Sequence, residues 1–489
     1  MSNSADASVP FSEGEVFPPS IVQKDSATYF MARLASNGNL LLGLRGSAEG
    51  FNVANRDSNG NFLSPLTPAN AAALRKRLPW LNPVPLGLKA SFGFGDRIGL
   101  ATPGHIAALR SADPQGQLAP ILAQQSVREN TRTGRTPQQV LDDATWAVFL
   151  SGWRKPWGAD ADHVKEVSDL GDFVQAGYTF YTIDPSDHVD NRADAATIPE
   201  LQAAVANLPW ALLETKLSDT QAFYSRQSFR ADGFTLAFNN EILLRALAKY
   251  GAAIAHTRTL ALALGAASVG QSFDLEMSVD ETDTPTSLQE HFFIANELTR
   301  LSVPVNSLAL RFVGKFQKGV DYIGNLAAFE KEFVRHAAIM SHFGSYKLSI
   351  HTGSDKFSLY QIIARHAAGR VHVKTAGTSY LEALRVLARH EPALFREILD
   401  LARGRFEVDR KTYFLDANLA RVPAASTLAD ADLPSLLDQF DARQVLHVAF
   451  GSVLSSFGDR LHPWLEQHLE QYWAALESHF IRHVSPFVR

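Results

Sequence analysis

The sequence has no cysteine among its 489 residues. Disulfide bonds, zinc sites built from thiolates and cysteine nucleophiles are therefore excluded. A bound metal ion would have to be held by histidine, by carboxylates or by neutral oxygen atoms. The sequence also lacks a phosphate-binding loop, and no GxGxxG motif follows any expected strand. A bound dinucleotide is therefore not expected.

Long apolar runs and blocks of basic residues are missing as well. No stretch reaches the roughly 18–20 apolar residues that a membrane-spanning helix needs, so we expect no membrane partner. The net charge is −5 and no basic cluster stands out, which argues against a nucleic-acid partner. The first residues lack the charged start and apolar core of a signal peptide, so we expect a cytoplasmic protein.

The clearest pattern that is present lies in the segment 271–314. An alternating apolar run at 272–279 ends among the carboxylates of Glu276, Asp280 and Glu281. Ser287 and Glu290 then have the spacing of a capping box, which marks the start of a helix. A second apolar run follows at 307–313. This strand–helix–strand pattern, with charged groups where the strands end, is typical of parallel sheets.

The same unit repeats along most of the chain. Apolar runs of strand length lie at 85–94, 119–125, 178–183, 272–279, 307–313, 347–351, 370–374 and 445–450. Most of these runs alternate with helical patterns, and residues 155–163 are a further candidate for a short strand. The pattern predicts an α/β fold, a (β/α)8 TIM barrel.

Segments outside this repeat predict additions to the barrel. Residues 1–85 contain a hairpin turn at Asn37-Gly38 and a helix near 67–77, which together predict an N-terminal β-hairpin and helix appendage. The barrel would span 86–455, with helical insertions near 185–268 and 386–440. Residues 456–489 predict an amphipathic helix that either seals the base of the barrel or forms a contact in a homo-oligomer.

A barrel of this kind gathers the carboxyl ends of its strands on one face. The residues at these ends form a polar rim of mixed charge, which would suit a polyhydroxy compound that bears an anionic group. The residues expected to bind such a substrate are Asp96, Arg97, Gln125, Arg128, Asp280, Lys315, Lys318, Ser354, Asp355, Lys356 and Lys374.

Two residues of the rim indicate a metal ion. His351 ends one strand, and Glu276 lies in a strand whose alternate residues are polar. An ionised carboxylate inside a barrel is unfavourable unless it is paired or binds a cation, and a divalent metal held by histidine and oxygen would explain both residues. Alternatively, His351 is a hydrogen-bonded core histidine and Glu276 pairs with Lys315 or Lys347.

Asp160, Asp162 and His163 form a second cluster, after Gly158. Asp162 either caps a following helix or acts as a base beside a histidine ligand.

Several blocks of the sequence resemble the tagaturonate/fructuronate epimerase family. They are 95–105, 158–163, 278–287 with Glu290-His291, 311–324, 351–358 and 373–380. The resemblance implies a metal-dependent enzyme that inverts C4 of a 2-keto-hexuronate and so interconverts tagaturonate and fructuronate. Relatives act on the neutral ketohexoses tagatose and fructose, so either a keto-uronate or a keto-sugar is the expected substrate.

The resemblance also implies roles for single residues. Asp162 would be an acid/base residue and Glu276 the opposing one, although the pattern alone made Glu276 a metal ligand. His163, His351 and Gln317 would hold a divalent cation such as Mn, Zn, Ni or Co.

The chemistry of such a substrate leaves two routes to inversion. The C2 carbonyl acidifies the hydrogen on C3 and not the one on C4, so direct proton removal at C4 is difficult. Either C3–C4 breaks and re-forms in a retro-aldol reaction, or two bases exchange the proton across the carbon. A metal-dependent ketose 3-epimerase or isomerase, and a sugar-binding protein without activity, are the alternative functions.

Overall fold

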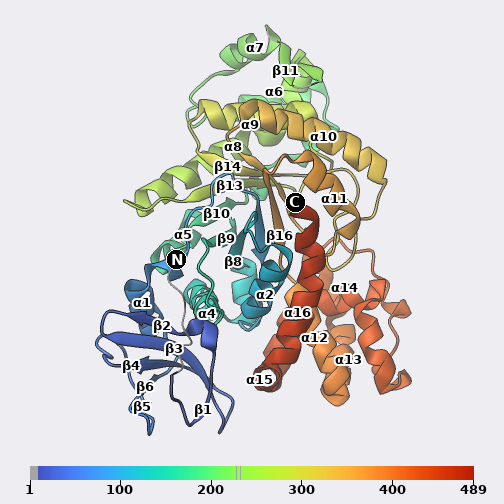
Figure 1. Ribbon diagram of the computed structural model, residues 1–489. Coiled ribbons are helices and arrows are strands. Elements are labelled where there is room, and N and C mark those ends of the chain that lie inside the picture. The colour runs from blue at the N-terminus through green and yellow to red at the C-terminus, as the bar shows by residue number, and fades with distance from the viewer. Residues whose placement is uncertain (1–8, 227, 232, 489) are drawn as a thin grey trace.

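Eight parallel strands close into a barrel at the centre of this computed structural model, which describes residues 9–226, 228–231 and 233–488 (Figure 1). The strands neighbour one another in the order β10-β13-β14-β15-β16-β7-β8-β9. Their bounds are β7 (Ser91–Phe94), β8 (Ala119–Ser126), β9 (Gly158–Val164), β10 (Phe180–Ile183), β13 (Asp274–Val279), β14 (Val305–Leu310), β15 (Lys347–Ile350) and β16 (Val371–Thr375). The predicted TIM barrel is confirmed.

Alternation along β13 shows how the barrel is built. Leu275, Met277 and Val279 are buried in the main hydrophobic core. The side chains between them lie on the opposite face of the strand, because successive residues of a strand alternate. Glu276 is fully buried there and pairs in register with Thr182 of β10. The strands therefore pack apolar side chains against the helices and leave polar groups inside the barrel.

One predicted strand is wrong. Residues 445–450 are not a strand but lie in α14 (Phe440–Val448) and at the start of α15 (Phe450–Gln467). A short buried apolar run has the same pattern in a helix and in a strand, so periodicity does not separate them. The eighth barrel strand is instead β9, which corresponds to residues 155–163, the further candidate for a short strand. Asp162 therefore lies inside a strand, and the reading of it as a helix cap is also wrong.

The N-terminal segment forms the expected appendage. It is an antiparallel sheet followed by one helix, and its hairpin turn contains Gly38, whose φ is 79°. The elements are β1 (Gly14–Val16), β2 (Val22–Lys24), β3 (Ala27–Leu34), β4 (Leu40–Arg45), β5 (Asn55–Arg56), β6 (Phe62–Ser64) and α1 (Pro68–Arg77). Residues 1–8 of the expected 1–85 segment lie outside the described residues.

Two long segments add further elements to the barrel, one between β10 and β13 and one after β16. Between β10 and β13 the chain forms α6 (Ile198–Ala206), α7 (Leu217–Ser225), the hairpin β11 (Ser228–Ala231) and β12 (Phe234–Ala237), and α8 (Asn240–Ala267). After β16 it forms α12 (Thr378–His390), α13 (Pro392–Asp409), α14, α15 and α16 (Leu469–Val484). The remaining helices are α2 (Thr102–Ala112), α3 (Val127–Thr133), α4 (Pro137–Leu150), α5 (Leu170–Ala176), α9 (Leu288–Arg300), α10 (Leu326–Phe343) and α11 (Phe357–His366).

The C-terminal tail is two helices rather than one, and its second helix packs on the barrel. α16 runs beside α2 (Figure 1). Leu476 lies so close to Gly104 that a Cβ atom there would be 2.7 Å from the Leu476 Cβ. Tyr472, Leu476 and Phe480 are fully buried. Among the helices of the described residues, none has both the length and the apolar character needed to cross a membrane.

Candidate active site

A polar cavity lies at the carboxyl ends of the barrel strands. Its empty space is about 440 Å³ including its opening to solvent. The lining comes from the ends of six strands and the loops that follow them, and from α14: Gln124, Asp162, His163, Asp280, Glu281, Lys318, Gly319, His351, Thr352, Ser354, Lys374, Ala376, Gly377 and His447. Residues distant in sequence therefore meet at one mouth of the barrel.

His351 is held between two carboxylates. Its Nε2 lies 2.6 Å from Glu276 Oε1, and its Nδ1 lies 3.1 Å from Asp280 Oδ1. Burial alone would lower the pKa of His351, but Asp280 and Glu276 raise it to about 10. Glu276 lies beneath His351, is fully buried and is also bonded to Thr182 and Ser307. Its carboxylate is therefore engaged by neighbouring side chains.

His163 reaches the cavity because β9 is irregular at this point. The register between β9 and β10 shifts beside it, and its φ is 53°, in the left-handed region that non-glycine residues seldom adopt. The His163 Nδ1 lies 3.4 Å from Asp184 Oδ2, and its Nε2 lies 3.7 Å from Asp162 Oδ1. The rings of His163 and His351 meet edge to face, with their planes 77° apart and their centroids 5.1 Å apart.

Lys374 joins the carboxylates of two strands. Its Nζ lies 2.8 Å from Asp160 Oδ2, 2.7 Å from Asp162 Oδ1 and 3.1 Å from Glu276 Oε1. Burial opposes ionisation of Asp162 and Glu276, yet Lys374 and the nearby imidazoles hold the pKa of both carboxyls well below the usual range. Burial raises the pKa of Asp160 to about 7. Asp162 is therefore an ionised base at the cavity wall.

The structure brings together about half of the residues that the sequence suggested. Asp162, His163, Asp280, Lys318, His351, Ser354 and Lys374 line the cavity, and Glu276 contacts two of them. Arg128 lines an adjoining cavity, which shares His163 and Glu281 with the first.

Other expected substrate-binding residues lie at strand ends but turn their side chains toward protein partners. Asp96 accepts hydrogen bonds from the backbone of Ile98, Gly99 and Ala101. Arg97 pairs with Glu129, Gln125 is hydrogen-bonded to Thr133 and Arg135, and Lys315 pairs with Asp416. The strand-end rule predicts the face of the barrel but not the path of each loop, and these four assignments stay predictions.

Gln317, Asp355 and Lys356 also bond to protein groups in this structure, and their assignments likewise stay predictions. The side-chain oxygen of Gln317 accepts hydrogen bonds from the Asp416 backbone at 3.0 Å and from Gln444 at 2.9 Å, which leaves it poorly placed to bind a metal ion. The Lys356 Nζ donates to three backbone carbonyls, and burial lowers its pKa to about 7. Asp355 pairs with Arg443 and His479.

The sequence reasoning missed Thr182 and His447. Thr182 is bonded to Asp160, Glu276 and Lys374, and it could have been noticed as a polar residue in an otherwise apolar strand. His447 lies in residues 445–450, which the sequence pattern predicts as a strand but which are helical. A Cβ at Gly377 would lie 2.0 Å from the His447 Nε2, so glycine at 377 leaves the room that His447 needs.

Comparisons with known proteins agree over nearly the whole chain. The model of the family described as UxaE, tagaturonate epimerase, matches residues 17–487. A tagaturonate/fructuronate epimerase of Thermotoga maritima is 42% identical over 475 residues, which are 96% of this chain and 96% of that protein.

Solved structures give the same result. The crystal structure of fructuronate-tagaturonate epimerase UxaE from Cohnella laeviribosi with one glycerol has a TM-score of 0.91 and 36% identity, covering 97% of this chain and 96% of that one. The native crystal structure of the same protein has a TM-score of 0.90 with the same identity and coverage.

Proposed function

This chain belongs to the UxaE family of tagaturonate epimerases, and we propose that it interconverts D-tagaturonate and D-fructuronate by inverting C4 with the help of a divalent metal ion. It is an epimerase, and so an enzyme of the isomerase class. The observation that carries the proposed chemistry is the meeting of Asp162, Lys374 and the neighbouring imidazoles of His163 and His351 at one cavity.

The donor set of the cavity fits a divalent cation. His163 Nε2, His351 Nδ1 and a carboxylate oxygen of Asp280 are the kinds of atom that Mn, Zn, Ni and Co bind. The other nitrogen of each imidazole lies near a second carboxylate, Asp184 for His163 and Glu276 for His351. Such partners orient metal-binding histidines in proteins. When bound, the cation would supply positive charge for substrate oxygens that become anionic.

Asp162 is the base in this proposal. It is ionised, lines the cavity and is oriented by Lys374 at 2.7 Å. In the retro-aldol route it takes the proton of the C4 hydroxyl, the C3–C4 bond breaks, and its electron pair becomes an enediolate delocalised toward the C2 oxygen. The aldehyde fragment then turns over and the bond re-forms on its other face, while Asp162 returns the proton.

The contacts of Glu276 favour a supporting role over direct proton transfer. It is fully buried beneath His351 and is bonded to Lys374, Thr182 and Ser307. Its contacts with His351 and Lys374 keep those two side chains in place, and Thr182 and Ser307 fix the carboxylate itself. This arrangement supports the retro-aldol route, which needs one base at C4, over exchange between two bases on opposite faces.

The carboxylate of the substrate needs a cation, and Arg128 is the best candidate. Lys374 is held by three carboxylates, Lys165 pairs with Asp187, and Lys318 donates to Thr352. The buried Nε of Arg128, by contrast, has no hydrogen-bond partner within the described part of the chain. Arg128 also lines the adjoining cavity, which shares His163 and Glu281 with the first. A charge-assisted hydrogen bond of this kind is worth about 1.5–3 kcal/mol, which is roughly 10–150-fold in binding.

Activity on tagaturonate with and without a chelator tests the proposed function. We expect fructuronate as the product, loss of activity with the chelator and recovery with Mn²⁺, Zn²⁺, Ni²⁺ or Co²⁺. Label entering C3 from D₂O would instead indicate a 3-epimerase or isomerase. Binding without turnover under all four metals would indicate a sugar-binding protein.

Arg128→Met tests the carboxylate site. We expect KM for tagaturonate to rise about 10–100-fold, with little change for the neutral ketose tagatose. Arg132→Met is the matched control, because Arg132 lies on the same helix and its guanidinium is also 5.4 Å from the Tyr413 ring. Equal effects of Arg128→Met on both sugars would contradict the assignment.

A further inference from the structure

We propose that His479 and His483 of α16, with Arg443 of α14, are positioning residues for the active site: through Asp355 they fix the loop 351–356 that presents His351, Thr352 and Ser354 to the cavity. The role of the loop in catalysis rests on the proposed function. The anchoring itself does not, and it can be tested without a substrate.

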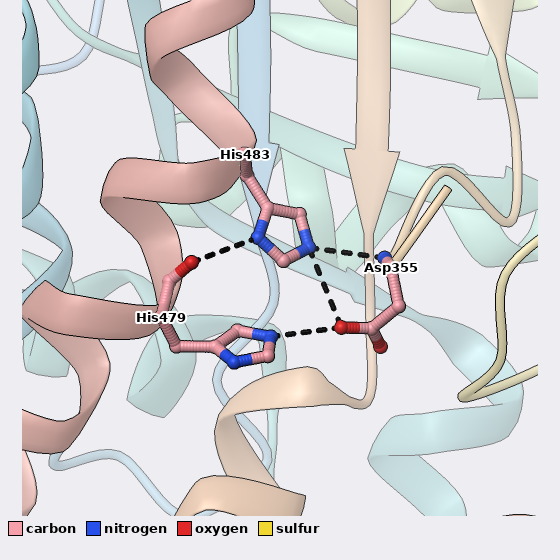
Figure 2. Close-up of side chains that lie close together, drawn as sticks. All are labelled: Asp355, His479 and His483. Atoms are coloured by element: carbon pink, nitrogen blue, oxygen red, sulfur yellow. Dashed lines mark hydrogen bonds and ion pairs between the residues drawn. The ribbon is translucent and has the colours of Figure 1, made fainter. Parts of the chain in front are cut away.

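The anchor is a buried cluster in which Asp355 meets two histidines one helical turn apart (Figure 2). His479 Nε2 lies 2.8 Å from Asp355 Oδ1. The backbone N–H of Asp355 donates to His483 Nε2 at 3.0 Å, and His483 Nδ1 lies 3.1 Å from the backbone oxygen of His479. These contacts require the tautomer of His483 that carries its proton on Nδ1. The end of the chain thus holds a loop 128 positions earlier.

Arg443 ties the same anchor to a second loop. Its Nη2 lies 2.9 Å from Asp355 Oδ2, and its Nε donates to the backbone oxygen of Gly319 at 2.5 Å. Gly319 and its neighbour Lys318 line the cavity. One guanidinium therefore sets the spacing between the loops that follow β14 and β15. Lys318 Nζ also donates a hydrogen bond to Thr352 Oγ1 at 2.9 Å, which connects the two loops directly.

The loop needs such support because its backbone is strained. Thr352 has a φ of 50° and Asp355 a φ of 61°, both in the left-handed region. That region is disfavoured for residues with a Cβ, most of all for β-branched ones such as threonine. Conformations of this kind persist only where the surrounding structure holds them. Since His351 begins this loop, a shift of the loop would move a proposed metal ligand.

The same three residues have the composition of a metal site, but their contacts favour an anchor. The lone pair of His483 Nε2 is occupied by the Asp355 N–H, and Asp355 Oδ2 is paired with Arg443. A cation would have to break the first bond and lie close to the guanidinium. Both histidines and Asp355 have ordered hydrogen-bond partners without a metal ion.

His483→Phe removes the anchor while preserving the packing, because His483 lies among the rings of Phe92, Phe357 and Tyr360. We expect kcat to fall about 10–100-fold, as is typical when a reacting group is displaced by a fraction of an ångström to 1 Å. His483→Gln, whose side-chain oxygen can accept the Asp355 N–H near the position of Nε2, should recover most of the rate. Leu476→Val is the control, since Leu476 packs against Gly104 of α2 and the change weakens the packing of the same helix away from the anchor.

Hydrogen exchange of the Asp355 amide provides the substrate-free readout. We expect exchange to be at least about 10-fold faster in His483→Phe than in the wild type, and unchanged in Leu476→Val. Full kcat in folded His483→Phe, or equal losses in both variants, would overturn the proposal. A metal ion retained by a His163→Ala/His351→Ala double variant and lost with His483→Gln would also overturn it, in favour of a metal site.

Discussion

The roles of the two aspartates on β9 can be separated by matched substitutions. Asp160 and Asp162 are two residues apart, and both contact Lys374, at 2.8 and 2.7 Å. Only Asp162 lines the cavity, whereas Asp160 is fully buried beside Thr182. Asp160→Asn and Asp162→Asn therefore each remove one carboxylate from the same lysine. They differ in which group faces the substrate.

The expected change in activity is large for one variant alone. Removing a general base lowers the rate by about 10²–10⁴-fold, so we expect that loss in kcat for Asp162→Asn. For Asp160→Asn we expect less than about 10-fold, because an amide in its place can still accept the hydrogen bond of Thr182 and leaves Asp162 paired with Lys374.

Stability should respond in opposite directions as the pH rises. The pKa of Asp160 is raised in the folded protein from 3.8 to about 7, which corresponds to about 4 kcal/mol. Its contribution to stability is present below pH 4 and is lost as the pH rises through about 7. Burial opposes ionisation of Asp162, but Lys374 lowers its pKa, so its contribution is present above pH 4 and is lost only in acid.

At pH 8, therefore, Asp160→Asn should be as stable as the wild type or more stable. Asp162→Asn should be destabilised by about 1.5–3 kcal/mol, the value of a hydrogen bond to a charged group. Chemical denaturation at pH 5 and pH 8, with kcat measured on tagaturonate at pH 8, checks both effects. Equal losses of kcat in the two folded variants would refute the assignment of Asp162 as the base.

Three further substitutions test the arrangement of the cavity. Lys374→Met should destabilise the protein by about 3–5 kcal/mol at pH 8, because it leaves the buried carboxylates of Asp160, Asp162 and Glu276 without their cation. The loss should be smaller at pH 5, where carboxylates without a cation are protonated, and denaturation at both pH values measures the difference. Gly377→Ala should displace the His447 ring and lower kcat without changing metal content, as kinetics and elemental analysis would show. The Gln317→Ala variant should keep the metal ion of the active site, because the Gln317 side chain is bonded to Gln444 and to the Asp416 backbone. Loss of the metal ion would show that Gln317 is one of its ligands.

The fold was predictable wherever local signals were strong. The capping box of Ser287 and Glu290 is present, and it starts α9 between two barrel strands as expected. Seven of the expected strands overlap barrel strands of the structure. β9 was harder to find because Asp160, Asp162 and His163 interrupt its apolar pattern, and acidic residues are unfavourable in most strands. The residues that weaken the strand signal are the residues that form the site.

The sequence was enough to predict on which face of the barrel the site lies. It was not enough to predict which side chains at that face point into the cavity. His351 and Lys374 lie at the ends of their strands and line the cavity, and their positions at strand ends are enough to predict them. Asp355 and Lys356 lie only a few residues beyond His351, but they belong to a loop whose path depends on α16 and α14. Those helices come more than eighty positions later, so no local pattern contains the information.

Lys374 shows why the electrostatics of the site depend on closure of the barrel. Its three carboxylate partners come from β9 and β13, which are not neighbours of β16 in the sheet. They meet only because all three strands face the same interior. A buried lysine is unfavourable alone and so are the buried carboxylates, but together they are stable. The ionised state of Asp162 is thus a property of the closed barrel, and damage to its closure should abolish activity before the chain unfolds.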